Sequence, residues 1–223
     1  MGALMRATDW AATPVGPPEH WPQSLRTAVS LVLESKFPML LCWGPRFTQF
    51  YNDPFRPILG ATKHPAIGQS TSDTFAEAWH IVGPLFERVM GGEAVRFEDM
   101  LVPLDRYGFL EDCYFTYSYS PIRAEDGEVA GVFVTCTETT GRVVGERRLQ
   151  LLRELAVDAI ASTPEEVCHR AAAVLARGTA DVPFAAIHLL ADDGVTLRPW
   201  RHAEPMRRSA SPGRCARRST PAR

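Results

Sequence analysis

The sequence lacks the features that mark membrane-inserted and exported proteins. Every stretch free of charged residues and proline is far shorter than the roughly 18–20 apolar residues that a membrane-spanning helix needs. The first 14 residues contain no apolar segment of the kind found in a signal peptide, and Arg6 stands where N-myristoylated chains carry Ser or Thr. These absences predict a cytoplasmic protein that does not enter the membrane.

Cysteine pairs and metal-ligand spacings are also missing. No two of the five cysteines form a CxxC pair, their number is odd, and most of them lie in apolar runs that resemble strands. This usage is typical of buried reduced thiols. The six histidines share no metal-ligand spacing with a cysteine or an acidic residue, so no metal site is predicted.

No catalytic motif is present. The chain has neither a GxSxG elbow nor an HExxH pair, and the Gly91-Gly92 pair lacks the preceding strand and following Lys of a phosphate-binding loop. Asp192 and Asp193 precede a glycine in an expected hairpin, where they are typical turn residues. The sequence therefore predicts no catalytic residue in this chain and leaves the activity of any longer parent protein open.

Lysine is almost absent, and the charge is unevenly distributed. Two lysines accompany 22 arginines, which indicates GC-rich DNA. The net charge of −2 divides into −8 for residues 1–200, with 17 basic and 25 acidic residues, and an Arg/Ser/Pro/Ala-rich tail over 201–223 that is predicted to be disordered. The tail is either a basic arm for nucleic acid or the product of a reading-frame shift. An interrupted domain directly upstream favours the frame shift, so nucleic-acid binding is not expected.

Residues 1–24 are predicted to form an extended arm. Three prolines between Trp10 and Trp21 exclude a regular helix or an inner strand there. Beyond the arm, apolar residues recur at helical spacing, which predicts a helix with one apolar face. The residues of that face are Leu25, Val29, Val32 and Leu33.

A hairpin and two helices are predicted next. Residues 37–43 and 47–51 are two short strand candidates separated by a Gly-Pro turn, as in a β-hairpin. Thr74 and Glu77 have the spacing of a capping box, which predicts a helix from that point. Pro84 is expected to open a second helix that ends at the glycine pair.

The following segment has the period of strands. Residues 97–104 form one candidate, and residues 113–119 alternate aromatic or apolar side chains with hydroxyl side chains. An Asp-Gly turn then leads into residues 129–134, which are apolar on both faces, as in a central strand. With the hairpin, these strands predict an α+β domain over 25–140 with a five-stranded antiparallel sheet.

Residues 141–161 are predicted to form a long connecting helix. Its leucines at 149, 152 and 155 belong to one apolar stripe, which would pair with its own copy in a homodimer or pack on its own domain. Residues 162–200 then begin with a second capping box and continue with a helix and a hairpin. This segment is too short to close a core of its own, so it is expected to be part of a larger α/β domain.

The order of these elements resembles that of PAS sensor domains. The likeness covers about residues 9–200 and is carried by segments that resemble the N-terminal PAS domains of bacterial sensor histidine kinases and, from Ser162, the start of a GAF domain. These segments include DWAATPVGPPEHWPQSLRTAVSLVL, FPMLLCWGP, FYNDPFRPILG, FTYSYSPIRAEDGEVAGVFV and TETTGRVVGERRLQLLRELA, followed by STPEEVCHRAAAVLA and DVPFAAIHLL.

The resemblance implies a dimeric module for sensing and signal transmission in a two-component sensor histidine kinase. The phospho-acceptor helix and the ATP-binding domain of such a kinase are absent from these 223 residues, and so is the cysteine motif of flavin-binding light sensors. The alternatives are the sensor region of a PAS–GAF phosphatase or cyclic-dinucleotide enzyme, and a stand-alone interaction protein that uses the basic tail.

The resemblance also implies two groups of site residues. In PAS domains an acidic-x-Thr step joins the last strand to the exit helix, and Glu138-Thr139-Thr140 matches it; with Leu149, Leu152 and Leu155, these are the signal-transmission candidates. A small-molecule ligand in the PAS domain is expected, although its identity is not predicted. The pocket candidates, for which packing in the core is the alternative role, are Trp43, Tyr51, Trp79, His80 and Tyr117.

Overall fold

The computed structural model describes residues 1–158 and 163–200. It divides the chain into two compact units, Met1–Val144 and Gly145–Arg223, which are considered separately. The predicted disordered tail over 201–223, and the end of the connecting helix at 159–161, lie outside the described residues.

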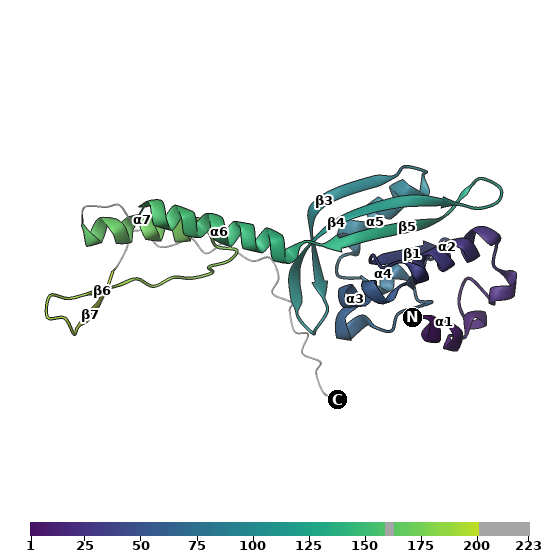
Figure 1. The fold of residues 1–223 in the computed structure, drawn as a ribbon, viewed down its shortest axis with the longest axis horizontal. Coiled ribbons are helices and arrows are strands. Elements are labelled where there is room, and N and C mark those ends of the chain that lie inside the picture. Colours follow the sequence, from purple (N-terminus) through teal and green to yellow (C-terminus); the bar gives the residue numbers. More distant parts are fainter. Residues whose placement is uncertain (159–162, 201–223) are drawn as a thin grey trace, which may run out of the picture. The chain divides into compact units, whose positions relative to one another are not determined.

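The first unit is built around one antiparallel sheet. Its strands lie in the order β2-β1-β5-β4-β3, and Figure 1 shows α6 following directly after β5. The predicted α+β class and the five-stranded antiparallel sheet are confirmed. The helices and strands up to this point are α1 (Gly2–Ala7), α2 (Gln23–Glu34), β1 (Met39–Trp43), β2 (Thr48–Tyr51), α3 (Arg56–Lys63), α4 (Thr71–Thr74), α5 (Trp79–Met90), β3 (Val95–Asp105), β4 (Leu110–Arg123), β5 (Val129–Glu138) and α6 (Thr140–Asp158), with 3₁₀ turns at Trp10–Ala12, Pro18–His20 and Asp53–Phe55.

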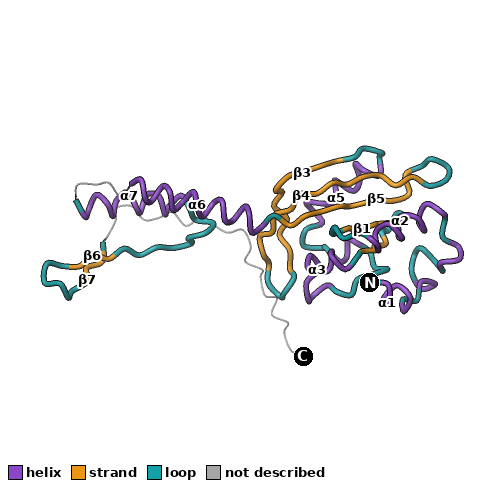
Figure 2. Tube along the Cα trace, in the orientation of Figure 1, coloured by secondary structure: helices purple, strands orange, loops and turns teal. Residues whose placement is uncertain are grey.

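The alternation of side chains in β4 decides which face of the sheet is buried. As the sequence predicts, Cys113, Phe115, Tyr117 and Tyr119 are all buried, while the residues between them are partly exposed. β5 pairs with β1 on one side and with β4 on the other, so the run that is apolar on both faces is indeed central. Figure 2 shows the three long strands side by side in orange.

The N-terminal arm packs against β1 and β2 on the face of the sheet opposite to the side chain of Leu40. The Phe50 ring stacks on Trp10 with centroids 4.9 Å apart and meets Trp21 edge-on at 5.4 Å. Phe50 pairs with Leu41, whose side chain points away from that of Leu40 because successive residues of a strand face opposite sides. The arm is therefore part of the core, and it contains one helix, α1, that the sequence did not predict.

Two predicted helix starts are wrong. Thr74 ends α4 instead of capping a helix, because its hydroxyl donates to the Ser70 carbonyl at 3.0 Å. Glu77 is engaged by Lys63, with Oε1 and Nζ 2.6 Å apart, so it does not complete a capping box. Pro84 lies inside α5 rather than at its start. It is tolerated on the exposed side of the helix, where the missing N–H does not leave a buried carbonyl without a donor.

The second unit contains the rest of α6 together with α7 (Pro164–Arg177), β6 (His188–Leu190) and β7 (Leu197–Pro199). The predicted cap of α7 is confirmed, since Thr163 Oγ1 accepts a hydrogen bond from the Glu166 N–H at 3.2 Å. The predicted hairpin is formed by β6 and β7, and Phe184, which precedes it, is exposed. Within the described residues, no helix has both the length and the apolar character needed to cross a bilayer.

Candidate functional site

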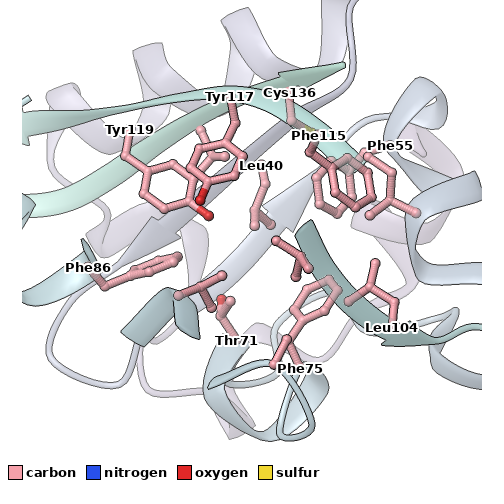
Figure 3. Close-up of a pocket in the computed structure, with 15 residues that line it drawn as sticks. Leu40, Phe55, Thr71, Phe75, Phe86, Leu104, Phe115, Tyr117, Tyr119 and Cys136 are labelled. Carbon is pink, nitrogen blue, oxygen red and sulfur yellow. The ribbon is translucent and has the colours of Figure 1, made fainter. Parts of the chain in front are cut away.

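A small cavity lies between the sheet and the helices α3 to α5. Its free volume is about 60 Å³. Figure 3 shows side chains of β4 and β5 on one side of it, with Phe86, Thr71 and Phe75 opposite. The lining residues are Leu40, Phe55, Ile58, Thr71, Phe75, Ala78, Val82, Phe86, Val102, Leu104, Phe115, Tyr117, Tyr119, Val134 and Cys136.

The lining of this cavity carries no ionised group at neutral pH. Desolvation raises the pKa of the Tyr117 hydroxyl to about 12 and that of the Cys136 thiol to about 12. The pKa of Tyr119 also lies well above its ordinary value, because the hydroxyl is fully desolvated. The polar groups that face the cavity are therefore neutral, and the cavity does not favour a charged molecule.

The size of the cavity limits what it holds in this conformation. Drug-sized ligands and cofactors occupy pockets of roughly 300–1,000 Å³, and an engineered apolar cavity of about 150 Å³ accepts benzene. At about 60 Å³, the present cavity is large enough for only a few heavy atoms. In residues 1–158 and 163–200, no group of three or more His, Cys, Asp or Glu side chains is arranged to hold a metal ion.

The five pocket candidates from the sequence do not gather at one place. Tyr117 lines the cavity, and its hydroxyl contacts Met100 Sδ. Tyr51 is buried elsewhere: its hydroxyl lies 2.9 Å from His64 Nδ1 and accepts a hydrogen bond from the Ala66 N–H at 3.0 Å. Trp43 is half-buried in β1, opposite Gly131 of β5.

The remaining two candidates lie at the start of α5. Trp79 is half-buried and packs on Phe86, with ring centroids 5.2 Å apart, whereas His80 is exposed to solvent. Neither is among the residues that line the cavity. Tyr119, which was not among the pocket candidates, does line the cavity. Its position in the alternating aromatic run of residues 113–119 is the sequence signal that could have identified it.

The acidic-x-Thr step joins β5 to the first turn of α6. Thr140 Oγ1 donates to Glu138 Oε1 at 2.9 Å and accepts the Tyr114 N–H at 2.9 Å. The Thr139 N–H donates to the Tyr114 carbonyl at 2.7 Å. The start of α6 is thereby bonded to β4 as well as to β5.

Arg106, in the turn between β3 and β4, connects the same junction to two further elements. Its guanidinium donates to Glu138 through two nitrogens, at 2.8 and 3.2 Å, and to Glu111 at 2.9 Å. Its carbonyl accepts the N–H groups of Ala61 and Thr62 in α3, at 2.9 and 3.2 Å. Burial disfavours the Arg106 cation, but the hydrogen bonds to Glu138 and Glu111 outweigh this effect and raise the pKa of the guanidinium.

A second ion pair ties α6 to the sheet. Arg142, in the first turn of α6, is hydrogen-bonded to Asp99 in β3, and this bond lowers the pKa of the Asp99 carboxyl group. Asp99 sits at the irregularity of β3 with a φ of +51°, a conformation that L residues rarely adopt. Neither Arg106 nor this pair was predicted from the sequence, because both contacts join residues that are far apart in the chain.

The leucine stripe of α6 divides between two environments. Leu149 and Leu152 are 47% and 62% exposed, and Leu155 is half-buried. Leu151, which was not assigned to the stripe, lies against Gly178 at the end of α7. Within the second unit, Glu154 also pairs with Arg177 of α7 at 3.0 Å. Two of the three predicted leucines are therefore left without cover.

Residues 46–144 match the model of a family described as the PAS fold. These residues are a PAS domain. The match includes the helices α3 to α5 and the strands β3 to β5, and it ends in the first turns of α6. The lining of the cavity belongs to this PAS domain, apart from Leu40 of β1.

Solved structures with a similar fold include three proteins of different description. An RNA-binding Light-Oxygen-Voltage receptor is 18% identical, with a TM-score of 0.43 over 63% of this chain and 40% of its own. The PAS domain of Bordetella pertussis BvgS is 19% identical, with a TM-score of 0.42 over 58% of this chain and 96% of its own. A sensory box sensor histidine kinase from Vibrio cholerae is 15% identical, with a TM-score of 0.35 over 53% of this chain and 97% of its own.

The chain thus spans less than half the length of the first of these structures. At such identities the similarity concerns the fold alone. A search of curated proteins found no match to this chain.

Proposed function

We propose that this chain is the sensory and dimerisation part of a bacterial two-component sensor histidine kinase, in which the PAS cavity receives a signal and α6 transmits it. The PAS fold of residues 46–144 supports a sensory role in signal transduction. The kinase context rests on the resemblance of the N-terminal segments and of the acidic-x-Thr step to such kinases.

The observation that carries the proposal is the short path from the cavity to the junction. Cys136, Leu104 and Ile58 line the cavity, and each lies two residues before a residue of the junction: Glu138, Arg106 and Gly60, respectively. The close approach of α3 to the turn requires Gly60, since a Cβ there would lie 2.4 Å from the Arg106 carbonyl oxygen. A change in cavity packing would therefore reach the Arg106–Glu138 pair through three backbone segments at once.

Transmission requires an element with two arrangements that a ligand stabilises to different degrees. We assign this role to α6, through its rotation or register against a second copy of itself. The exposed Leu149 and Leu152 support an interface of this kind. The alternative, in which α6 packs only on its own domain, covers Leu151 but leaves these two leucines in solvent.

A chimera tests the proposal directly. Residues 1–158 are fused through α6 to the phospho-acceptor and ATP-binding domains of a histidine kinase, and one to seven residues are inserted after Arg153. A coiled-coil output has a period of seven residues, so autophosphorylation should return with the seventh inserted residue and change at intermediate lengths. An activity that declines steadily with length, or ignores it, would contradict transmission through α6.

The dimer interface has a matched control. Leu149→Gln with Leu152→Gln should shift the 223-residue chain from dimer to monomer in sedimentation velocity experiments. Leu31→Gln, on α2, replaces a leucine that is 62% exposed, the same fraction as Leu152, and should leave the oligomeric state unchanged. A double variant that stays dimeric would contradict the interface.

We further propose that residues 163–200 begin a GAF domain. Phe184, Val195 and Leu197 are 81%, 84% and 63% exposed, which supports a missing partner surface. The test is translation of the DNA beyond codon 200 in the other two frames. A continued strand pattern would support the GAF assignment, and the absence of pattern in both frames would contradict the frame-shift explanation of residues 201–223.

A further inference from the structure

The Tyr119 hydroxyl is a polar group in the cavity wall that remains unused. Tyr119 is 6% exposed and lines the cavity, and Figure 3 shows its hydroxyl directed into the interior beside that of Tyr117. The two rings stack with centroids 4.8 Å apart and an interplanar angle of 15°. Among the residues that the structure describes, none forms a hydrogen bond with the Tyr119 hydroxyl, although buried hydroxyl groups are ordinarily paired.

The neighbouring hydroxyl groups of the cavity already have partners. Tyr117 directs its hydroxyl to Met100 Sδ, and Thr71 donates to the Phe47 carbonyl at 2.8 Å. The Thr71 hydroxyl also lies 3.1 Å from Cys42 Sγ. Tyr119 is therefore the hydroxyl group of the cavity that remains free to bind a guest.

We propose that the cavity binds an uncharged molecule of about three heavy atoms with one hydrogen-bond acceptor, to which the Tyr119 hydroxyl donates. The number of atoms follows from volume, since a cavity of about 150 Å³ holds the six carbons of benzene, and about 60 Å³ is available here. The ligand carries an acceptor because the Tyr119 phenol, whose pKa is raised by burial, keeps its proton at neutral pH, and a phenol O–H donates a stronger hydrogen bond than its oxygen accepts.

The ligand is uncharged because nothing in the cavity compensates a charge. Its fifteen lining residues include no Asp, Glu, Lys, Arg or His. A carboxylate or an ammonium group would lose its hydration there without gaining an ionic partner. The class that fits is a small ether, carbonyl compound or alcohol.

This inference rests on the sensory role proposed above, because it assigns the chemistry of the ligand that α6 would report. Tyr119 pairs with Val134 in β5 and with Val95 in β3. β5 reaches Glu138 four residues after Val134. Because Val134 and Cys136 of β5 also line the cavity, a guest bonded to Tyr119 lies against the strand that leads into α6.

Three probes of nearly equal shape separate acceptor, apolar and charged ligands: dimethyl ether, propane and dimethylammonium. Each is titrated into the 223-residue chain with isotope-labelled methyl groups, and the NMR signals of Leu40, Val102 and Val134 report on the cavity. Dimethyl ether should shift these signals saturably and bind about fivefold more tightly than propane, as expected for one net hydrogen bond. Dimethylammonium should leave them unchanged.

Tyr119→Phe should abolish the preference for the ether and leave propane binding as it was. Tyr117→Phe is the matched control, because it removes a hydroxyl from the adjacent stacked ring and should retain the preference. If Tyr119→Phe proves too unstable to titrate, the ratio of ether to propane affinity in the unaltered chain decides the question.

Equal affinities for ether and propane in the unaltered chain would overturn the proposal, as would tighter binding of dimethylammonium. Saturable shifts confined to residues outside the cavity would also overturn it. So would a cavity that admits no probe, in which a water molecule alone satisfies Tyr119. None of these outcomes affects the seven-residue period expected of the kinase chimera, so failure of the ligand assignment and failure of the sensory proposal are distinguishable.

Discussion

Replacing Arg106 tests whether the junction between the sheet and α6 stabilises the PAS domain. Arg106→Gln removes three hydrogen bonds between the guanidinium and two carboxylates and leaves Glu111 and Glu138 without their cation. The Arg106 side chain is 12% exposed, and the two carboxylates are 24% and 30% exposed, so the pair is screened far less than one on the surface. A hydrogen bond to a charged group contributes about 1.5–3 kcal/mol to stability. Removing one partner of a fully buried ion pair costs about 3–5 kcal/mol.

Because the two carboxylates are partly exposed, water can solvate them once the arginine is gone. We therefore expect Arg106→Gln to lower the free energy of unfolding by about 2–3 kcal/mol, less than for a fully buried pair. In a unit of this size, that loss lowers the melting temperature by roughly 5–10 °C. Urea unfolding followed by tryptophan fluorescence measures it, because Trp10 and Trp21 are buried in the first unit.

Arg96→Gln is the matched control. Arg96 lies in β3 and forms an ion pair with Glu98, and the two side chains are 69% and 67% exposed. Loss of this ion pair should change the free energy of unfolding by less than about 0.5 kcal/mol. Equal losses for Arg106→Gln and Arg96→Gln would refute the reasoning, because burial of the Arg106 network would then contribute nothing.

Three further perturbations follow from the packing. Gly60→Ala places a Cβ 2.4 Å from the Arg106 carbonyl oxygen and should cost about 3 kcal/mol or more, whereas Gly16→Ala, also at positive φ but in open space, should cost about 1 kcal/mol; similar losses in urea unfolding would contradict the close approach. Trp10→Ala should cost about 3–5 kcal/mol, because it removes the ring stacked on Phe50, and a loss below 1 kcal/mol would show that the arm is not part of the core. Burial raises the pKa values of Cys42 and Cys136 from 9.0 to about 12, so their contribution to stability is complete below pH 9 and is lost as the pH rises towards 12. The free energy of unfolding should fall by about 1.4 kcal/mol per pH unit for each thiol, and equal stability at pH 8 and pH 10 would contradict it.

The parts of the fold that the sequence predicts are those encoded by local periodicity. The aromatic alternation of residues 113–119 predicts a half-buried strand. These residues form the middle of β4, and every second side chain there is buried. The cap at Thr163 is predicted equally well, because the capping side chain and its target lie three residues apart. The same pattern at Thr74 fails, since Ser70 and Lys63 engage its two members, and neither competitor is visible in the pattern itself.

The site depends on contacts that no local pattern encodes. Arg106 meets Glu138 across 32 residues, and its role could be found only after the strands were in register. The cavity is lined from four strands and from the helical segment between β2 and β3, so the sequence offers Tyr117 and Tyr119 as alternating aromatics without showing what they face. The three leucines of α6 combine both situations. Helical spacing predicts that they lie near one another, but it does not predict which surface covers them.

The position of β5 in the sheet also determines when the PAS domain can close during synthesis. β5 is made last and lies between β1 and β4, so before it emerges the β1–β2 and β3–β4 hairpins each present an unpaired edge. Open edges of this kind are templates for aggregation. The ten residues of β5 cover both edges at once, and α6 begins two residues after them. A pause in translation that leaves β3 and β4 outside the ribosome while β5 is still inside its exit tunnel therefore prolongs the exposure of both edges, and the exposure ends only when β5 has emerged.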